Sequence, residues 1–460
     1  MKKIKLLIAL LCAAQGVFAQ ISQKYLDNWN DPYIQHRIED GIRQNRMGNF
    51  TVRFEDKQGN PVSDVEIEVK QIKHDFYFGA NGFMVNGFKD PKENGLFEKY
   101  FTQLFNFVTI PFYWPELEPQ PGKLRFDKDS DPIYRRPAPD LVFEFSEKYG
   151  LTPKGHTLVW DNPRWSIPTW LPQNANVREQ KISKRIEEIA QRYGHRIQLW
   201  DVANEVTDGH PDVVMPKDYT FKAFKESERS FPYSNDFTLN FTTGIWKRAF
   251  RREYSSDYLL IDNLRLRGAK IDAIGFQYHN FNEAEYWKIL EGEVFDPRSL
   301  YNTLDIYSDF HLPLHITEIT ISALSEKGPE YQAIMTENLY KLWFSHPNVQ
   351  AIIWWNLVDE TAAPGYTRPD GSVVRGEDKW KGGLLNRDFT KKPAFEVLDR
   401  LINKEWKTNL TTRTVSKTNR VSFNGFYGTY ELQIKKEGKI IIKTVDFSKK
   451  SSDNQLVILD

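Results

Sequence analysis

The sequence predicts an α/β protein, a (β/α)8 TIM barrel with a small accessory β domain formed by N- and C-terminal segments. Eight short apolar runs alternate with stretches of helical pattern, as the strands and helices of such a barrel do. Several of these runs end in polar or aromatic side chains that a buried strand would not need. Short strand-like runs before and after the barrel region predict the accessory domain.

The eight runs have the length and continuous hydrophobicity of buried parallel strands. They cover residues 76–79, 105–110, 152–158, 197–203, 258–262, 273–277, 312–319 and 351–356. Helical patterns such as 177–193 and 331–345 separate most of them. Only about ten residues join the fifth run to the sixth, near the minimum for a crossover. Either that helix is cut to a turn or two, or residues 259–266 are the helix and the fifth strand is irregular.

The two ends of the chain predict β-structure. After a partly helical leader with Ile34, Ile38 and Ile42 at four-residue spacing, runs at 50–54 and 65–69 flank a Gly59-containing turn and predict a β-hairpin. A hairpin alone is unstable, and the simplest partner is the tail, with strand-like runs at 421–423, 430–434, 440–442 and 456–459. We therefore expect a leader and hairpin at 20–73, a catalytic barrel at 74–400 and a C-terminal β segment at 401–460.

Residues 1–19 have the pattern of a signal peptide. Lys2, Lys3 and Lys5 precede an apolar run, and Val17-Phe18-Ala19 is a small-residue cleavage site. The only cysteine, Cys12, lies inside this run, so the mature chain would have no disulfide or thiolate chemistry. These features predict a secreted or periplasmic protein.

Composition excludes several kinds of partner. Lys+Arg equals Asp+Glu at 62 each, so no basic field for nucleic acid is expected. No later apolar run is long enough to span a membrane. No cluster has the spacing of a catalytic metal site, and we expect no metal and no cofactor; His311 and His315 fit a loop and a strand better than a zinc helix.

Two glutamates follow apolar runs. Asn204-Glu205 ends the run at 197–203, and Glu318 ends the run that begins at 312. Each alone reads as a capped strand end. Since the C-terminal ends of barrel strands meet at one face, the two together predict the carboxylate pair of a glycosidase.

Five ordered motifs carry a resemblance to a known family. They are Gly155-His156-Thr157-Leu158-Val159-Trp160, Trp200 to Glu205, Gly275-Phe276-Gln277-Tyr278-His279, Ile316-Thr317-Glu318 and Trp354-Trp355-Asn356-Leu357-Val358-Asp359. From about residue 74 to 400 the chain resembles glycoside hydrolase family 10, the retaining endo-β-1,4-xylanases. The β leader and the tail motif Gly425-Phe426-Tyr427-Gly428-Thr429-Tyr430 resemble a subgroup of that family that is well represented in plants.

The resemblance implies a role for each motif. Glu205 would be the acid/base and Glu318 the nucleophile, with Asn204 donating to the sugar 2-hydroxyl. His279 would touch the nucleophile, and Gln277 would orient it or the substrate. His156, Trp160 and Trp355 would line the central subsite, and Trp380 is a candidate for a mobile aromatic wall. We expect an apolar surround and the charge of Glu318 to raise the pKa of Glu205.

Simpler interpretations of some of these residues stay open. Without the motifs, His156 and His279 would read as satisfied core histidines, and Trp160 as plain packing. For Trp200 packing is the preferred interpretation, and Asp201 reads as a structural carboxylate.

The sequence departs from the family in two stretches that bear on the substrate. The family's second strand carries an Asn-Glu-Met-Lys-Trp motif that grips the non-reducing-side xylose, whereas residues 110–114 here are Ile-Pro-Phe-Tyr-Trp. Thr320 stands where the family has an acid that supports the histidine, which weakens the restraint on His279.

Four functions follow as alternatives. The chain would be a retaining hydrolase of xylan, or one acting on a decorated xylan or another β-linked glycan. It would otherwise be a catalytically impaired carbohydrate-binding protein, or an adhesin acting through its β domain. In each case the expected partner is a polysaccharide or oligosaccharide.

Overall fold

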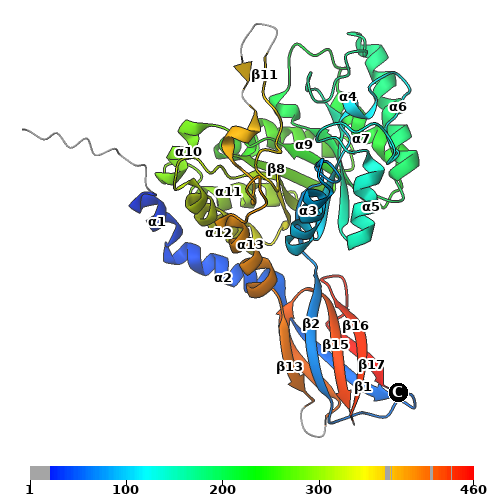
Figure 1. The fold of residues 1–460 in the computed structure, drawn as a ribbon, viewed down its shortest axis with the longest axis vertical. Helices are drawn as coiled ribbons and strands as arrows, with labels where there is room; N and C mark the ends of the chain where they lie inside the picture. The colour runs from blue at the N-terminus through cyan, green and yellow to red at the C-terminus, as the bar shows by residue number, and fades with distance from the viewer. Residues whose placement is uncertain (1–20, 368–372, 375, 415–417, 437, 460) are drawn as a thin grey trace, which may run out of the picture.

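The computed structural model describes residues 21–367, 373–374, 376–414, 418–436 and 438–459, so the expected signal peptide lies outside the described residues. A barrel and an elongated β domain lie end to end, and strands from both ends of the chain mix in the β domain (Figure 1). Within these residues no helix is both long and apolar enough to cross a bilayer.

The predicted barrel is confirmed. Its strands close in the order β10-β3-β4-β5-β6-β7-β8-β9, and each pairs in parallel with its neighbours. Their bounds are β3 Tyr77–Asn81, β4 Phe107–Pro111, β5 Thr152–Trp160, β6 Leu199–Asn204, β7 Asp236–Phe241, β8 Ala273–His279, β9 Leu314–Thr320 and β10 Val349–Trp354. Seven of the eight predicted runs overlap these strands.

Helices with one apolar face surround the barrel. In α6 (Ala175–Tyr193) Ile182, Ile186 and Ile189 are buried at helical spacing, and the Asn174 side chain accepts the Val177 N–H at the first turn. The other elements of this layer are α3 Pro91–Leu104, α4 Trp114–Leu117, α5 Pro139–Tyr149, η1 Val206–Asp208, α7 Tyr219–Ser230, α8 Gly244–Arg248, η2 Ala249–Tyr254, α9 Ser256–Leu266, α10 Glu283–Leu290, α11 Pro297–Ser308, α12 Gly328–Ser345, η3 Glu377–Trp380, α13 Pro393–Arg400 and η4 Leu401–Glu405. A short hairpin of β11 (Tyr366–Thr367) and β12 (Val373–Val374) stands beyond β10.

The predicted fifth strand at 258–262 is wrong. Those residues lie in α9, so the alternative that residues 259–266 form the helix is confirmed. Ile261 and Leu264 are buried while Leu259 and Leu266 are exposed, which is a helical pattern. The fifth strand is β7, whose Phe237, Leu239 and Phe241 alternate with buried Thr238 and Asn240. The crossover is therefore not short, because residues 242–272 join β7 to β8.

The predicted hairpin at 50–69 is also wrong in its pairing. β1 (Met47–Asp56) lies between β14 (Arg420–Phe426) and β17 (Asn454–Leu459) in one sheet. β2 (Glu66–His74) lies between β13 (Asn409–Arg413) and β15 (Gly428–Lys436) in a second sheet, which β16 (Lys439–Phe447) completes. The two sheets pack face to face around one core, in which Phe50 of β1 stacks on Phe447 of β16 at 4.4 Å between ring centroids.

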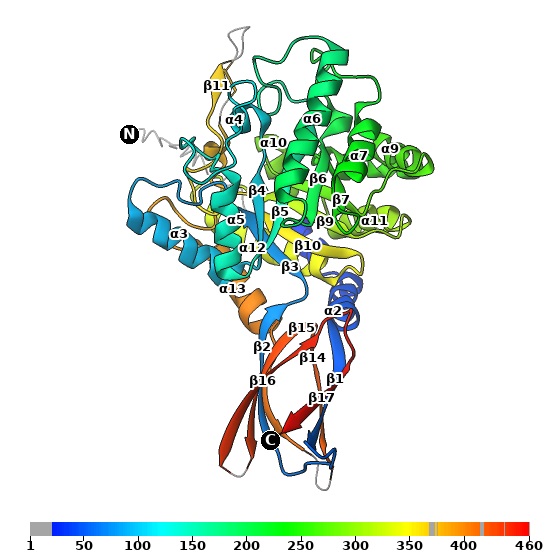
Figure 2. The ribbon, with the colours of Figure 1, turned by 90° about the vertical axis from the view of Figure 1, so that its right-hand side faces the viewer.

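The leader connects the two parts. Helices α1 (Gln23–Trp29) and α2 (Pro32–Arg46) lie along the barrel, and Arg46 at the end of α2 is buried. Its guanidinium donates to the Val349 carbonyl at 2.7 Å and lies over the Phe76 ring at 4.7 Å. Because β2 of the β domain leads directly into β3, this domain lies at the N-terminal ends of the barrel strands. The strand β11 lies at the opposite end of the barrel (Figure 2).

Candidate active site

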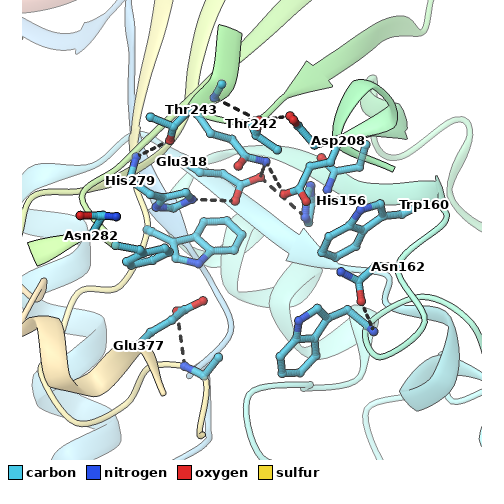
Figure 3. A pocket seen from close by; sticks show the side chains of 18 of the residues that line it. His156, Trp160, Asn162, Asp208, Thr242, Thr243, His279, Asn282, Glu318 and Glu377 are labelled. Carbon is cyan, nitrogen blue, oxygen red and sulfur yellow. Dashed lines mark hydrogen bonds and ion pairs between the residues drawn. The ribbon is translucent and has the colours of Figure 1, made fainter. Parts of the chain in front are cut away.

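A cleft of about 630 Å³ opens where β5, β6, β8 and β9 end. Its lining includes eight of the nine predicted residues, namely His156, Trp160, Asn204, Glu205, Gln277, His279, Glu318 and Trp355. In Figure 3, Glu318 and His279 are joined by a dashed line, and Trp160 lies on the other side of His156. Barrel active sites are built at this face of the strands, which is where the cleft lies.

One amide joins the two predicted catalytic carboxylates. Gln277 Nε2 donates to Glu205 Oε1 at 2.8 Å and to Glu318 Oε1 at 3.1 Å. These two oxygens are therefore separated by no more than the sum of the two distances, 5.9 Å. Carboxyl groups of retaining glycosidases are roughly 5–5.5 Å apart, and those of inverting ones roughly 6.5–9.5 Å apart.

The backbone turns sharply at Glu205. This residue has φ of 56°, in the left-handed region, directly after β6. Its N–H donates to the Asn240 carbonyl of β7 at 2.8 Å, so the turn stays tied to the barrel while the side chain enters the cleft.

Asn240 is a central residue of the site that the sequence-based reasoning missed. Its Nδ2 donates to Glu318 Oε1 at 2.9 Å and to Asn204 Oδ1 at 2.8 Å, and its Oδ1 accepts from the Thr317 hydroxyl at 2.6 Å. The period-two alternation of β7 was the available signal. Since Asn240 holds Asn204 by its oxygen, the buried Asn204 Nδ2 is left without a protein partner and free to donate to a ligand.

The environment of Glu205 sets its protonation state. Burial, and then the charge of Glu318, raise the pKa of Glu205 to about 8, although the hydrogen bond from Gln277 and the nearby amide of Asn204 act in the opposite sense. At neutral pH Glu205 therefore carries a proton that it can give to a leaving group.

A second buried carboxylate supports His156. Asp201 Oδ1 forms an ion pair with Lys154 Nζ at 2.7 Å, and Asp201 Oδ2 contacts His156 Nδ1 at 2.8 Å. Burial alone would raise the pKa of Asp201, but Lys154 and His156 outweigh it and hold that pKa below its usual value. An ionised Asp201 orients the ring so that His156 Nε2 lies 3.9 Å from Glu318 Oε1.

The His279 ring is held by hydrogen-bond contacts on both nitrogens, although Thr320 stands where an acid was expected. Its Nε2 lies 3.3 Å from Glu318 Oε2, and its Nδ1 lies 2.9 Å from the Thr320 hydroxyl. The hydroxyl supplies a hydrogen bond in place of a charge. Phe281 stacks on the His279 ring at 4.6 Å between centroids.

Only some of the tryptophans considered in the sequence line the cleft. Trp160 and Trp355 line the cleft, and Trp355 meets His156 edge-on at 5.7 Å between centroids. Trp380 is 5% exposed and lies outside the cleft lining, behind Phe281 at 6.1 Å between centroids. Trp200, at the start of β6, packs against Phe112 rather than facing the cleft.

The departure at residues 110–114 places Tyr113 in the cleft wall. The Tyr113 ring meets His156 edge-on at 5.5 Å between centroids, and Arg136 lies over its face at 3.7 Å. Arg135 and Arg136 both line the cleft, and no local pattern in the sequence pointed to them. Among the described residues, no group of three or more His, Cys, Asp or Glu side chains could hold a metal ion.

Comparison with known proteins identifies the family. The family model for glycosyl hydrolase family 10 matches residues 73–400. The chain belongs to this family. The match covers the whole barrel, from β3 to the end of α13.

Curated relatives are about one-quarter identical. They include anti-sigma-I factor RsgI6 of Acetivibrio thermocellus (25% over 86% of this chain and 46% of that protein) and endo-1,4-beta-xylanase B of Paenibacillus barcinonensis (25% over 54% of this chain and 76% of that protein). A third is endo-1,4-beta-xylanase 5-like of Arabidopsis thaliana, 24% identical over 87% of this chain and 64% of that protein. The chain thus spans about half the length of the first and less than two-thirds of the third.

A solved xylanase structure supports the barrel fold. Xylanase 10B from Thermotoga petrophila in complex with xylobiose aligns with a TM-score of 0.54 at 20% identity, covering 72% of this chain and 95% of that chain.

Proposed function

We propose that this protein is a secreted retaining endo-β-1,4-xylanase. The observation that carries the proposal is the carboxylate pair Glu205 and Glu318, which share one amide donor in a cleft at the strand ends. Membership of glycosyl hydrolase family 10 and the xylanases among its relatives support xylan as the polymer. The pattern of residues 1–19 supports secretion.

The proposed reaction has two displacements. Glu205, protonated at neutral pH, donates to the leaving glycosidic oxygen while Glu318 attacks the anomeric carbon and forms a glycosyl-enzyme. Glu205, now a carboxylate, takes a proton from water, which displaces Glu318 and restores both groups. The free Nδ2 of Asn204 donates to the sugar 2-hydroxyl, and this bond strengthens as the ring approaches the oxocarbenium-like transition state.

Hydrolysis of a panel of β-glycans, with analysis of the products, tests this proposal. We expect xylan and xylo-oligosaccharides to be cleaved internally with retention at the anomeric carbon, as followed by nuclear magnetic resonance early in the reaction. Glu318→Ala should abolish turnover, and Glu68→Ala, at an exposed position of β2, is the matched control. Binding of xylan with no turnover of any glycan would instead favour the carbohydrate-binding alternative.

A decorated xylan is the second candidate substrate. Tyr113, two residues after β4, lines the cleft with Arg135 and Arg136 of the loop before α5, where the family resemblance implies a different set of polar groups. A site built from different polar groups discriminates between substrates, so the same panel should include substituted xylans.

A further inference from the structure

Two arginines lie side by side in the wall of the cleft. Arg135 and Arg136 follow β4 in the loop before α5, and they are 3% and 7% exposed. Both line the cleft together with Tyr113. Burying two adjacent cations is costly unless an anion or a set of oriented dipoles compensates them.

Neutral groups hold both guanidinium groups in place. Arg135 Nη1 donates to Asn356 Oδ1 at 2.6 Å and to the Thr361 carbonyl at 2.5 Å. Arg136 lies over the Tyr113 ring at 3.7 Å, with the Phe83 ring at 5.3 Å. Such contacts fix the planes of the guanidinium groups without neutralising their charge.

Carboxylates of the protein pair with this arginine pair less closely than with the other cations in the cleft. Lys247 pairs with Glu285 at 2.6 Å, and Arg248 pairs with Asp208 at 2.9 Å. In contrast, no carboxylate among the described residues lies within 4.0 Å of Arg135.

The nearest acids leave donors free on both arginines. Glu116 Oε2 approaches Arg136 Nε only to 3.9 Å, beyond hydrogen-bond distance. Glu377 also lines the cleft, but its Oε2 accepts from Asn356 Nδ2 at 3.3 Å. The Nε groups of Arg135 and Arg136 are buried and have no hydrogen-bond partner.

We propose that Arg135 and Arg136 recognise the carboxylate of a uronic acid carried by the polysaccharide substrate. The inference rests on the proposed glycosidase function and specifies its substrate class as an acidic, decorated xylan. Paired guanidinium donors match a carboxylate in geometry and charge, and a ligand carboxylate would compensate the buried charge.

The first test uses wild-type protein and a matched substrate pair. Uronic-acid-substituted xylo-oligosaccharides are compared with the same oligosaccharides after reduction of the carboxyl to the alcohol, which keeps the shape and removes the charge. We expect kcat/KM to be on the order of tenfold to one-hundredfold higher for the acidic form, as charge-assisted hydrogen bonds give. The preference should shrink at high salt.

Equal kcat/KM for the two forms would overturn the inference and leave the proposed function standing. Absence of turnover with both forms, and with unsubstituted xylo-oligosaccharides, would overturn the proposed function itself. A preference for sulfated oligosaccharides over uronic-acid-bearing ones would overturn the assignment to a carboxylate.

Variants localise the effect. Arg136→Gln should bring the ratio of kcat/KM for acidic over reduced substrate towards one, and Arg136→Lys should retain only part of it because the fork geometry is lost. Arg43→Gln, on exposed α2 outside the cleft, is the matched control and should keep the wild-type ratio. A wild-type ratio in a folded Arg136→Gln protein would contradict the assignment.

Discussion

Replacing Glu205 with glutamine should stabilise the folded protein at neutral pH while removing its proton donor. The pKa of Glu205 is raised from 4.5 to about 8, chiefly because burial disfavours the carboxylate. A raised pKa in the folded state means that stability is fully present below about pH 4.5 and is lost as pH rises towards 8. Glutamine resembles the protonated acid in shape and cannot ionise, so Glu205→Gln avoids this loss.

The size of the effect follows from the shift in pKa. Each unit is worth about 1.4 kcal/mol, so the free energy of unfolding of Glu205→Gln should exceed that of wild type by about 3 kcal/mol at pH 7. The gain should approach about 5 kcal/mol above pH 8 and vanish near pH 4.

Urea or thermal unfolding of the two proteins between pH 4 and 9 measures this difference. The control is Glu68→Gln, at an exposed position of β2, for which the difference from wild type should not change with pH. A difference between Glu205→Gln and wild type that stayed constant from pH 4 to pH 9 would refute the assignment of a protonated acid at Glu205. Activity gives a second reading, because kcat/KM of wild type should fall above about pH 8 as Glu205 loses its proton.

Three further substitutions test the supporting structure. Asn240→Ala removes a hydrogen bond to the Glu318 carboxylate and should lower kcat about tenfold to one-hundredfold in steady-state assays. An unchanged kcat would show that this bond does not position the nucleophile. Asp201→Asn leaves Lys154 buried without its anion and should cost about 3–5 kcal/mol in urea unfolding, of which a Lys154→Met partner substitution should restore part. Phe50→Ala opens a cavity in the sandwich core and should cost about 3–5 kcal/mol in thermal unfolding, whereas a loss below 1 kcal/mol would mean that the two sheets are not held together there.

Part of this protein could be predicted from its sequence because the relevant signals are local. Short apolar runs at regular intervals predict parallel strands, and polar residues at their ends predict the catalytic face. Glu205 and Glu318 were predicted in this way, whereas the roles predicted for the histidines and tryptophans came from the resemblance to the family.

The errors have a common cause, since the same local pattern fits two structures. An apolar stretch of five residues fits a strand or one side of a helix, and the buried face of α9 was therefore mistaken for the fifth strand. Alternating runs on either side of a turn fit a hairpin, whereas β1 and β2 pair with the distant strands β14 and β15 instead.

Only the tertiary structure decided how the site is held and what it presents to a substrate. Closing the barrel brings Asn240 between Asn204 and Glu318, residues 36 and 78 positions away along the chain. The loop before α5 carries Arg135 and Arg136 to the ring of Tyr113, although nothing near them in the sequence marks a binding site. Periodicity reports which side chains are buried, but the partner of a buried amide or charge depends on which elements meet in space.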